Sequence, residues 1–114
     1  MATPESKVKA AVVKMLKDNG VYYFFPVTGG YGRAGVPDII CCHKGRFIAI
    51  ECKANGNKPT ELQLREIHKI RKAGGIAFVI DEKNTDVIRN WLKIWGTGQK
   101  NYTIASEEKD NENE

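Results

Sequence analysis

Two carboxylates and a lysine lie at one end of two consecutive apolar runs in this chain. Asp38 directly precedes the run IICCH, and Glu51 and Lys53 lie where the next run, RFIAIEC, ends. Only Lys44-Gly45 separates the two runs, and glycine readily adopts the positive φ that a two-residue hairpin turn requires. We therefore predict an antiparallel hairpin whose open end carries all three charged side chains.

The register of this hairpin determines which side chains meet. A two-residue turn pairs His43 with Arg46 and, counting outward, Asp38 with Glu51. A four-residue loop preserves this register, whereas a three-residue loop breaks it. Directly opposed side chains have Cβ atoms about 4.5–5.5 Å apart, so the two carboxylates repel each other unless a proton or a cation lies between them. Lys53, two residues beyond Glu51, projects from the same face of the strand.

An acidic pair of this kind is typical of a Mg²⁺ site. Mg²⁺ binds oxygen ligands, retains several waters and accepts phosphate oxygens from a substrate. Such an ion would activate water and offset charge on a scissile phosphate, while Lys53 would orient the nucleophile or stabilise developing negative charge. The spacing alone equally allows a surface salt bridge between Glu51 and Lys53 beside an unrelated turn aspartate.

Hydrophobic periodicity predicts the elements that position these residues. The predicted order is αβββαβα, with Leu62, Ile67 and Ile70 as buried positions of the second helix and Gly96 ending the third. Pro26 indicates that the first strand is an edge strand or ends early, and the hairpin strands are apolar on both faces, so helices should cover each face. The segments are helix 3–19, strands 21–27, 39–43 and 46–52, helix 60–73, strand 76–80 and helix 84–95; residues 97–105 fit either a short strand or coil.

The cysteines do not form a metal-binding pattern. Cys41, Cys42 and Cys52 lie in apolar runs without CxxC spacing, and only His43 and His68 could join them as zinc ligands. Buried thiols are therefore the prediction, and a zinc site is the weaker alternative.

The charge distribution favours a polyanionic partner. Of 18 basic and 14 acidic side chains, residues 106–114 hold five acids and one base, which leaves a net charge of +8 over residues 1–105. A body this basic suits nucleic acid, although a solvated lysine surface is a common alternative. We predict a single domain over residues 1–105 followed by a disordered acidic tail, 106–114.

The glycine-rich loop TGGYGRAG is predicted to be a surface for nucleic acid. Tyr31 could stack on a base and Arg33 could reach a phosphate, although a plain linker fits nearly as well. Lys58 could contact phosphate or simply be solvated. The loop also fits GxGxxG, but a dinucleotide-binding fingerprint needs its glycines to open a helix, whereas Val36-Pro37 leads into a strand.

The motifs PD (37–38) and ECK (51–53) closely resemble the PD-(D/E)xK nuclease signature. The predicted element order is similar to the αβββαβ core of that superfamily. Within it, GVPDII and IAIECKANGNKPTELQ resemble the virus-type replication-repair nuclease (VRR-NUC) group, over residues 5 to 90. The resemblance implies an α/β domain with a restriction-endonuclease-like core, in which helices flank a central mixed sheet.

The resemblance also implies metal-dependent phosphodiester hydrolysis. Asp38 and Glu51 would bind Mg²⁺ or Mn²⁺ together with the backbone carbonyl of Cys52, and Lys53 would be the catalytic lysine. Glu5 would match the acid of the first helix that often supports the metal, although an acid in the first turn usually just complements the helix dipole.

Gln63 has two interpretations. The resemblance matches it to a glutamine that follows the ExK strand in related nucleases and acts at the site. Equally, Thr60 to Gln63 is a capping box, a motif that stabilises a helix start without any part in catalysis. The sequence leaves both interpretations open.

The combined prediction is a metal-dependent, structure-specific endonuclease that cuts branched DNA such as four-way junctions. Free-standing members of the group look like junction resolvases, and a protein this short needs a second subunit to present two sites, so we predict a homodimer. The strand VYYFF or the helix with Trp91 and Trp95 could supply its apolar contact, unless both are core. Cleavage of flaps or nicked duplex, and a non-catalytic nucleic-acid-binding module, remain the alternatives.

The location of the protein is predicted from what the sequence lacks. No basic leader precedes an apolar stretch, and no apolar run approaches the roughly 20 residues of a membrane span. We therefore expect a cytosolic protein of a bacterial or phage-infected cell.

Overall fold

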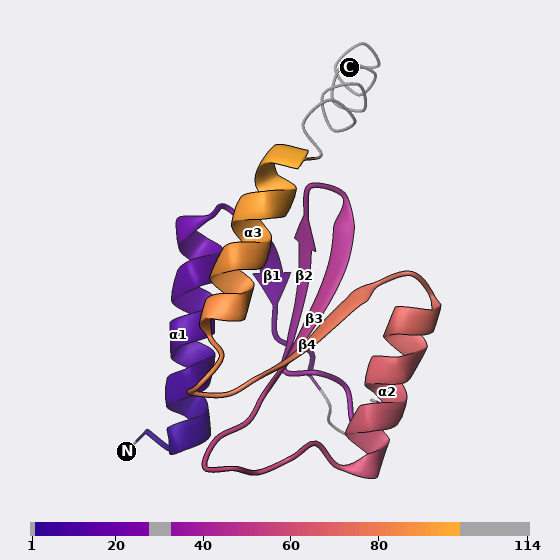
Figure 1. The fold of residues 1–114 in the computed structure, drawn as a ribbon. Helices are drawn as coiled ribbons and strands as arrows, with labels where there is room; N and C mark the ends of the chain where they lie inside the picture. Colours follow the sequence, from indigo (N-terminus) through magenta and orange to yellow (C-terminus); the bar gives the residue numbers. More distant parts are fainter. Residues whose placement is uncertain (1, 28–32, 99–114) are drawn as a thin grey trace.

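The structure, a computed structural model, describes residues 2–27 and 33–98, and the side chains up to residue 94. Three helices and four strands alternate in the predicted order (Figure 1). They are α1 (Pro4–Asp18), β1 (Tyr22–Phe24), β2 (Ile39–His43), β3 (Arg46–Cys52), α2 (Glu61–Lys72), β4 (Ile76–Ile80) and α3 (Asp86–Gly98). The predicted tail, 106–114, lies outside the described residues.

The four strands form one mixed sheet in the order β1-β2-β3-β4. β1, β2 and β3 are antiparallel neighbours, and β4 runs parallel to β3. A parallel pair needs a crossover connection, and α2 supplies it. The predicted α/β fold class, with helices flanking a central mixed sheet, is therefore confirmed.

The β2–β3 hairpin has the predicted register. Lys44 and Gly45 form its turn with φ values of 52° and 80°, the left-handed conformations that a type I′ turn requires. His43 pairs with Arg46 and Ile39 pairs with Ile50. The ladder therefore ends one step before Asp38 and Glu51, the two acids that the register predicts to be opposite each other.

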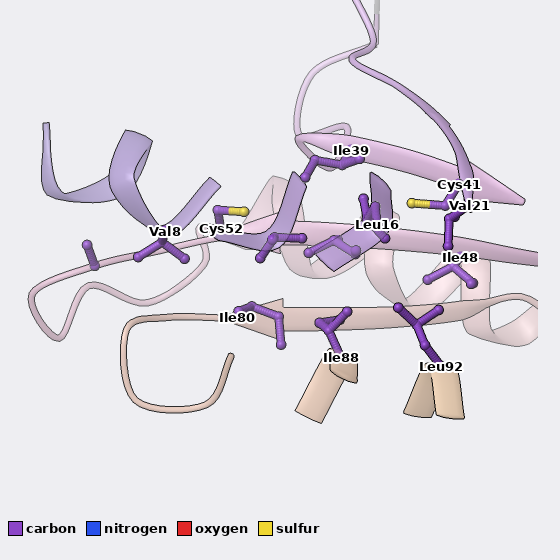
Figure 2. Close-up of a cluster of buried hydrophobic side chains, with 13 residues drawn as sticks. Val8, Leu16, Val21, Ile39, Cys41, Ile48, Cys52, Ile80, Ile88 and Leu92 are labelled. Carbon is purple, nitrogen blue, oxygen red and sulfur yellow. The ribbon is translucent and has the colours of Figure 1, made fainter. Parts of the chain in front are cut away.

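Two hydrophobic clusters lie on opposite faces of the sheet. In Figure 1, α1 and α3 lie side by side, and α2 stands apart from them. Alternate residues of β3 divide between the clusters, since Ile48, Ile50 and Cys52 pack with α1 and α3, whereas Ala49 packs with α2. Figure 2 shows the larger cluster, to which α1 contributes Val8, Val12 and Leu16 and α3 contributes Ile88 and Leu92.

The smaller cluster explains two predictions that are wrong. In α2 only Ile67 is fully buried and Ile70 packs against the same cluster, but Leu62 is 49% exposed because it lies outside the stripe that faces the sheet. Cys42 is exposed rather than buried, because α2 covers the part of this face formed by β3 and β4 and leaves the β1–β2 part open.

Two element boundaries also differ from prediction. β1 is confined to Tyr22–Phe24 and lies at the edge of the sheet, as Pro26 indicates. α3 continues through Gly96 to Gly98, because one glycine inside a helix costs only about 1 kcal/mol and does not end it. None of the described helices is long and apolar enough to cross a bilayer.

Candidate active site

The predicted site forms where β2 begins and β3 ends. Beyond the last β2–β3 pair, the Asp38 side chain takes the place of a strand partner, and its Oδ2 accepts a hydrogen bond of 2.8 Å from the backbone N–H of Cys52. On the other side of β3, the Lys53 N–H donates to the carbonyl of Ile80 at 2.8 Å. The backbone that carries Glu51, Cys52 and Lys53 is therefore held on both sides.

Glu51 is a buried carboxylate, with only 2% of the residue exposed. Its Oε2 accepts a hydrogen bond of 3.0 Å from Nε2 of Gln63 and lies 3.5 Å from Nζ of Lys53. Burial, followed by the charge of Asp38, raises the pKa of Glu51 to about 7, and Lys53 acts in the opposite direction. A surface salt bridge, the alternative interpretation, does not describe an acid this deeply buried.

The other oxygen of Glu51, Oε1, is buried and has no hydrogen-bond partner among the residues that the structure describes. Buried polar atoms are normally satisfied, so an unpaired carboxylate oxygen beside Asp38 fits a cation. The described residues contain no group of three or more His, Cys, Asp or Glu side chains placed to hold a metal. A metal here would take two carboxylates and complete its shell with backbone oxygen and water, as Mg²⁺ commonly does.

Cys52 could serve such a site only through its backbone. Its side chain is buried in the cluster beneath α1 and α3, on the face opposite Glu51. Burial, followed by the charge of Asp38, raises the pKa of the Cys52 thiol to about 12. The thiol therefore stays protonated in the metal-free protein, and it faces away from Glu51.

Gln63 forms a capping box and also contacts Glu51. Its Oε1 accepts a hydrogen bond of 2.9 Å from the Thr60 N–H, and Thr60 Oγ1 accepts one of 3.2 Å from the Gln63 N–H, which is a complete capping box. Its Nε2 remains free to donate to Glu51. The capping box therefore holds the Gln63 side-chain amide in place, and the Nε2 of that amide orients the buried Glu51 carboxylate.

Glu5 reaches the site from the first turn of α1. Its carboxylate lies 4.0 Å from Nζ of Lys53, and its side chain is 54% exposed. Lys53, with a side chain only 12% exposed, thus lies between Glu5 and Glu51. The structure brings together five predicted residues: Glu5, Asp38, Glu51, Lys53 and Gln63.

Gly35 positions α2 against the segment that leads to Asp38, and sequence reasoning missed it. Its φ is +79°, and a Cβ placed there would lie 2.6 Å from the backbone carbonyl carbon and oxygen of Leu62 and 2.9 Å from the backbone nitrogen of Gln63. Only glycine allows this approach. The glycine directly before VPD was the available signal, but a sequence does not reveal which backbone approaches it.

The predicted nucleic-acid-binding residues that the structure describes, Arg33 and Lys58, form no hydrogen bond or ion pair with this cluster. Arg33 pairs with Glu66 of α2 at 3.4 Å rather than with the site acids. Lys58 is exposed in the loop before α2, and Tyr31 is outside the described residues. Residues 33–38 form a turn that leads into β2 without a helix, which excludes the dinucleotide-binding geometry.

Comparison with known proteins identifies the family. The sequence pattern described as "Archaeal holliday junction resolvase (hjc)" matches residues 6–112. The chain belongs to the Hjc family. A similar protein, 36% identical over 85 residues that cover 74% of this chain and 88% of the relative, is "Putative nuclease p44" of Acyrthosiphon pisum secondary endosymbiont phage 1.

A solved structure described as "VRR_NUC domain" agrees with this Hjc-family assignment. It superimposes with a TM-score of 0.64 and 26% identity, covering 78% of this chain and 97% of the other. The predicted membership of the VRR-NUC group is confirmed, and this Hjc-family protein is a nuclease with the VRR-NUC fold.

Proposed function

We propose that this nuclease is a metal-dependent endonuclease that hydrolyses phosphodiester bonds of branched DNA, with four-way junctions as its preferred substrate. The observation that carries the proposal is the buried Glu51: its Oε2 contacts the Gln63 amide and Lys53, while its Oε1 has no hydrogen-bond partner among the described residues. The nearby charge of Asp38 contributes to raising its pKa. The description of the matching family as a Holliday junction resolvase supports the choice of substrate.

In this proposal Asp38, Glu51 and the backbone carbonyl of Cys52 hold Mg²⁺ or Mn²⁺. When bound, the ion activates water for attack and offsets negative charge on the scissile phosphate. The Lys53 ammonium donates hydrogen bonds to the nucleophile or to the phosphate oxygens on which charge develops. Gln63 fixes the orientation of Glu51, and Glu5 fixes that of Lys53, through the contacts of 3.0 Å and 4.0 Å.

The test is a cleavage panel on labelled four-way junction, flap, nicked duplex, intact duplex and single-stranded DNA. Each substrate is incubated with Mg²⁺, with Mn²⁺ and with EDTA, and Asp38→Asn serves as the matched inactive control because it keeps the shape of the side chain. We expect junction cleavage with either ion and none with EDTA or Asp38→Asn. Faster cleavage of flaps would overturn the substrate, and binding without cleavage would indicate a non-catalytic module.

The active species in this proposal is a homodimer. Junction resolution requires incisions on two strands, and a two-fold dimer presents two identical sites. The exposed aromatic side chains of Tyr22, Phe24 and Phe47 supply an apolar surface for the contact. We place this activity in the cytoplasm of a bacterial or phage-infected cell, in keeping with the phage source of the similar nuclease.

A further inference from the structure

Lys9 is a cation near the site, and none of the roles proposed above involves it. It lies four residues after Glu5 in α1, so the two side chains project from the same face of the helix. That face borders the site, because the Glu5 carboxylate lies 4.0 Å from Nζ of Lys53. Lys9 is half-buried, whereas Lys7, Lys14 and Lys17 of the same helix are exposed.

An aromatic ring holds the Lys9 ammonium in place. Its Nζ lies 4.2 Å from the centroid of the Phe25 ring, a cation–π contact. The end of β1 lies beside the start of β2, since Phe24 pairs with Ile40. Phe25 follows directly after this pair, and β2 begins with Ile39. Ile39 directly follows Asp38 in the sequence. The ring therefore fixes a positive charge beside the strand that carries the first site acid.

The same ammonium has no carboxylate partner within the described part of the protein. Lys14 pairs with Asp18 at 2.9 Å and Lys53 pairs with Glu51 at 3.5 Å, but no such ion pair involves Lys9 in residues 2–27 and 33–94. A contact with an aromatic face leaves N–H donors of the ammonium available for an anion.

We propose that Lys9 binds a backbone phosphate of the DNA strand adjacent to the scissile phosphate. The inference rests on the proposed nuclease function and adds a binding residue to it. Asp38, Glu51 and Glu5 form an acidic centre that repels the DNA backbone, and Lys53, which lies between Glu5 and Glu51, serves the scissile phosphate rather than its neighbour. A second cation held in place by Phe25 offsets that repulsion for the neighbouring phosphate without touching the reacting atoms.

The test compares Lys9→Gln with Lys17→Gln, which removes the same charge from the exposed last turn of the same helix. Junction affinity is measured in EDTA by fluorescence anisotropy at several salt concentrations, and cleavage is then measured in Mg²⁺. For Lys9→Gln we expect about tenfold weaker binding, a salt slope lower by about 0.9 because one phosphate contact is lost, and a rise in KM that exceeds any fall in kcat. Lys9→Arg should restore affinity.

The outcomes separate this inference from the proposed function. If the wild type cuts DNA and Lys9→Gln matches Lys17→Gln in affinity and salt slope, Lys9 contacts no phosphate and only this inference fails. A fall in kcat with unchanged KM and unchanged slope would also overturn it. If the wild type neither binds nor cuts any DNA in the presence of metal, the proposed function fails and this inference fails with it.

Discussion

At the scale of single residues, Asp38 and Glu51 should be separable from Lys53 by experiment. Asp38→Ala or Glu51→Ala removes a metal ligand together with a charge that repels phosphate. Cleavage should therefore be lost, while DNA affinity stays the same or increases. Lys53→Ala should also be inactive but should still bind Mn²⁺, measured by calorimetry. Cleavage at the wild-type rate by a folded Asp38→Ala would contradict the assignment of the site.

Glu51 should also make the stability of the metal-free protein depend on pH. Its pKa in the folded protein is raised from 4.5 to about 7, so the folded state holds a proton that the unfolded chain releases between these values. Stability should fall as pH rises from 4.5 to 7 and then level off. A pKa difference of one corresponds to about 1.4 kcal/mol, and the pKa of Glu51 rises from 4.5 to about 7, so the loss should be on the order of 3–4 kcal/mol.

The matched variant for this pH effect is Glu51→Gln, which cannot ionise. Urea unfolding in EDTA at pH 5 and pH 8 should show a smaller fall for Glu51→Gln than for the wild type, and the variant should be the more stable protein at pH 8. Adding Mg²⁺ should stabilise the wild type at pH 8 and leave the variant nearly unchanged. Equal pH dependence of the two proteins would contradict a raised pKa at this position.

Gln63 should affect both stability and turnover, because one amide serves two contacts. Gln63→Ala removes part of the capping box and the donor to Glu51, so it should cost about 1 kcal/mol of stability and also lower kcat. Thr60→Ala is the matched control, since it weakens the same cap and leaves the hydrogen bond to Glu51 in place. Equal turnover losses in the two variants, measured well below their melting temperatures, would show that Gln63 acts only as a cap.

At the scale of elements, the sequence predicted those parts of the fold that depend on residues close together in the chain, such as the hairpin turn. Lys44-Gly45 favours one turn type, and that turn determines the whole β2–β3 register, so the position of Asp38 beside the end of β3 followed from the sequence. The position of α2 on the sheet did not follow, because it depends on packing against β3 and β4. The exposure of Leu62 and Cys42 is a consequence of that packing.

The site itself was predictable to the same extent. Asp38, Glu51 and Lys53 lie at one end of the β2–β3 strand pair, so spacing and register sufficed to bring them together. The joint contact of Gln63 with Thr60 and Glu51 required the position of α2 relative to β3, which no local pattern encodes. The close approach of Gly35 to the backbone of α2 is equally non-local.

Gly35→Ala should therefore disturb the junction between α2 and the segment before Asp38. A Cβ at this position meets the backbone of Leu62 at 2.6 Å with φ at +79°, so the expected cost is about 1–3 kcal/mol, with a loss of cleavage as Gln63 moves away from Glu51. Gly20→Ala is the control, because its φ is +68° and no atom of the described residues lies within 4 Å of its Cβ position. If Gly35→Ala costs no more stability than Gly20→Ala and cuts normally, the close approach has no part in the site.

At the scale of the whole molecule, no described helix covers the β1–β2 part of the sheet face on which α2 packs. The strand pairings place Tyr22, Cys42 and Phe47 in one row across β1, β2 and β3, with Phe24 and Ile40 in the next row. Tyr22 is 69% exposed, Phe24 47% and Phe47 48%. We call Tyr22, Phe24, Cys42 and Phe47 the aromatic face. Exposed apolar side chains gathered in this way are typical of protein interfaces.

The second candidate surface for a dimer contact, on α3, is a weaker one. Trp91 packs against the main core, with its ring 6.0 Å from that of Phe78 in an edge-on arrangement, and the Trp95 side chain lies outside the described residues. Ile94 is 64% exposed on the same helix. A lysine substitution at Ile94 therefore tests the α3 surface independently of the aromatic face.

The last prediction is that the aromatic face joins two copies of the protein. The double variant Tyr22→Lys with Phe47→Lys places two charges in the row formed by Tyr22, Cys42 and Phe47. Light scattering at micromolar concentration should therefore show a fall in mass from twice 12.8 kDa to the monomer mass. The monomer should lose paired, symmetric incision of junctions, because the two DNA strands of a junction would be cut in separate binding events. Ile94→Lys should remain dimeric. A wild type that stays monomeric on junction DNA would overturn the dimer, and dissociation by Ile94→Lys alone would move the contact to α3.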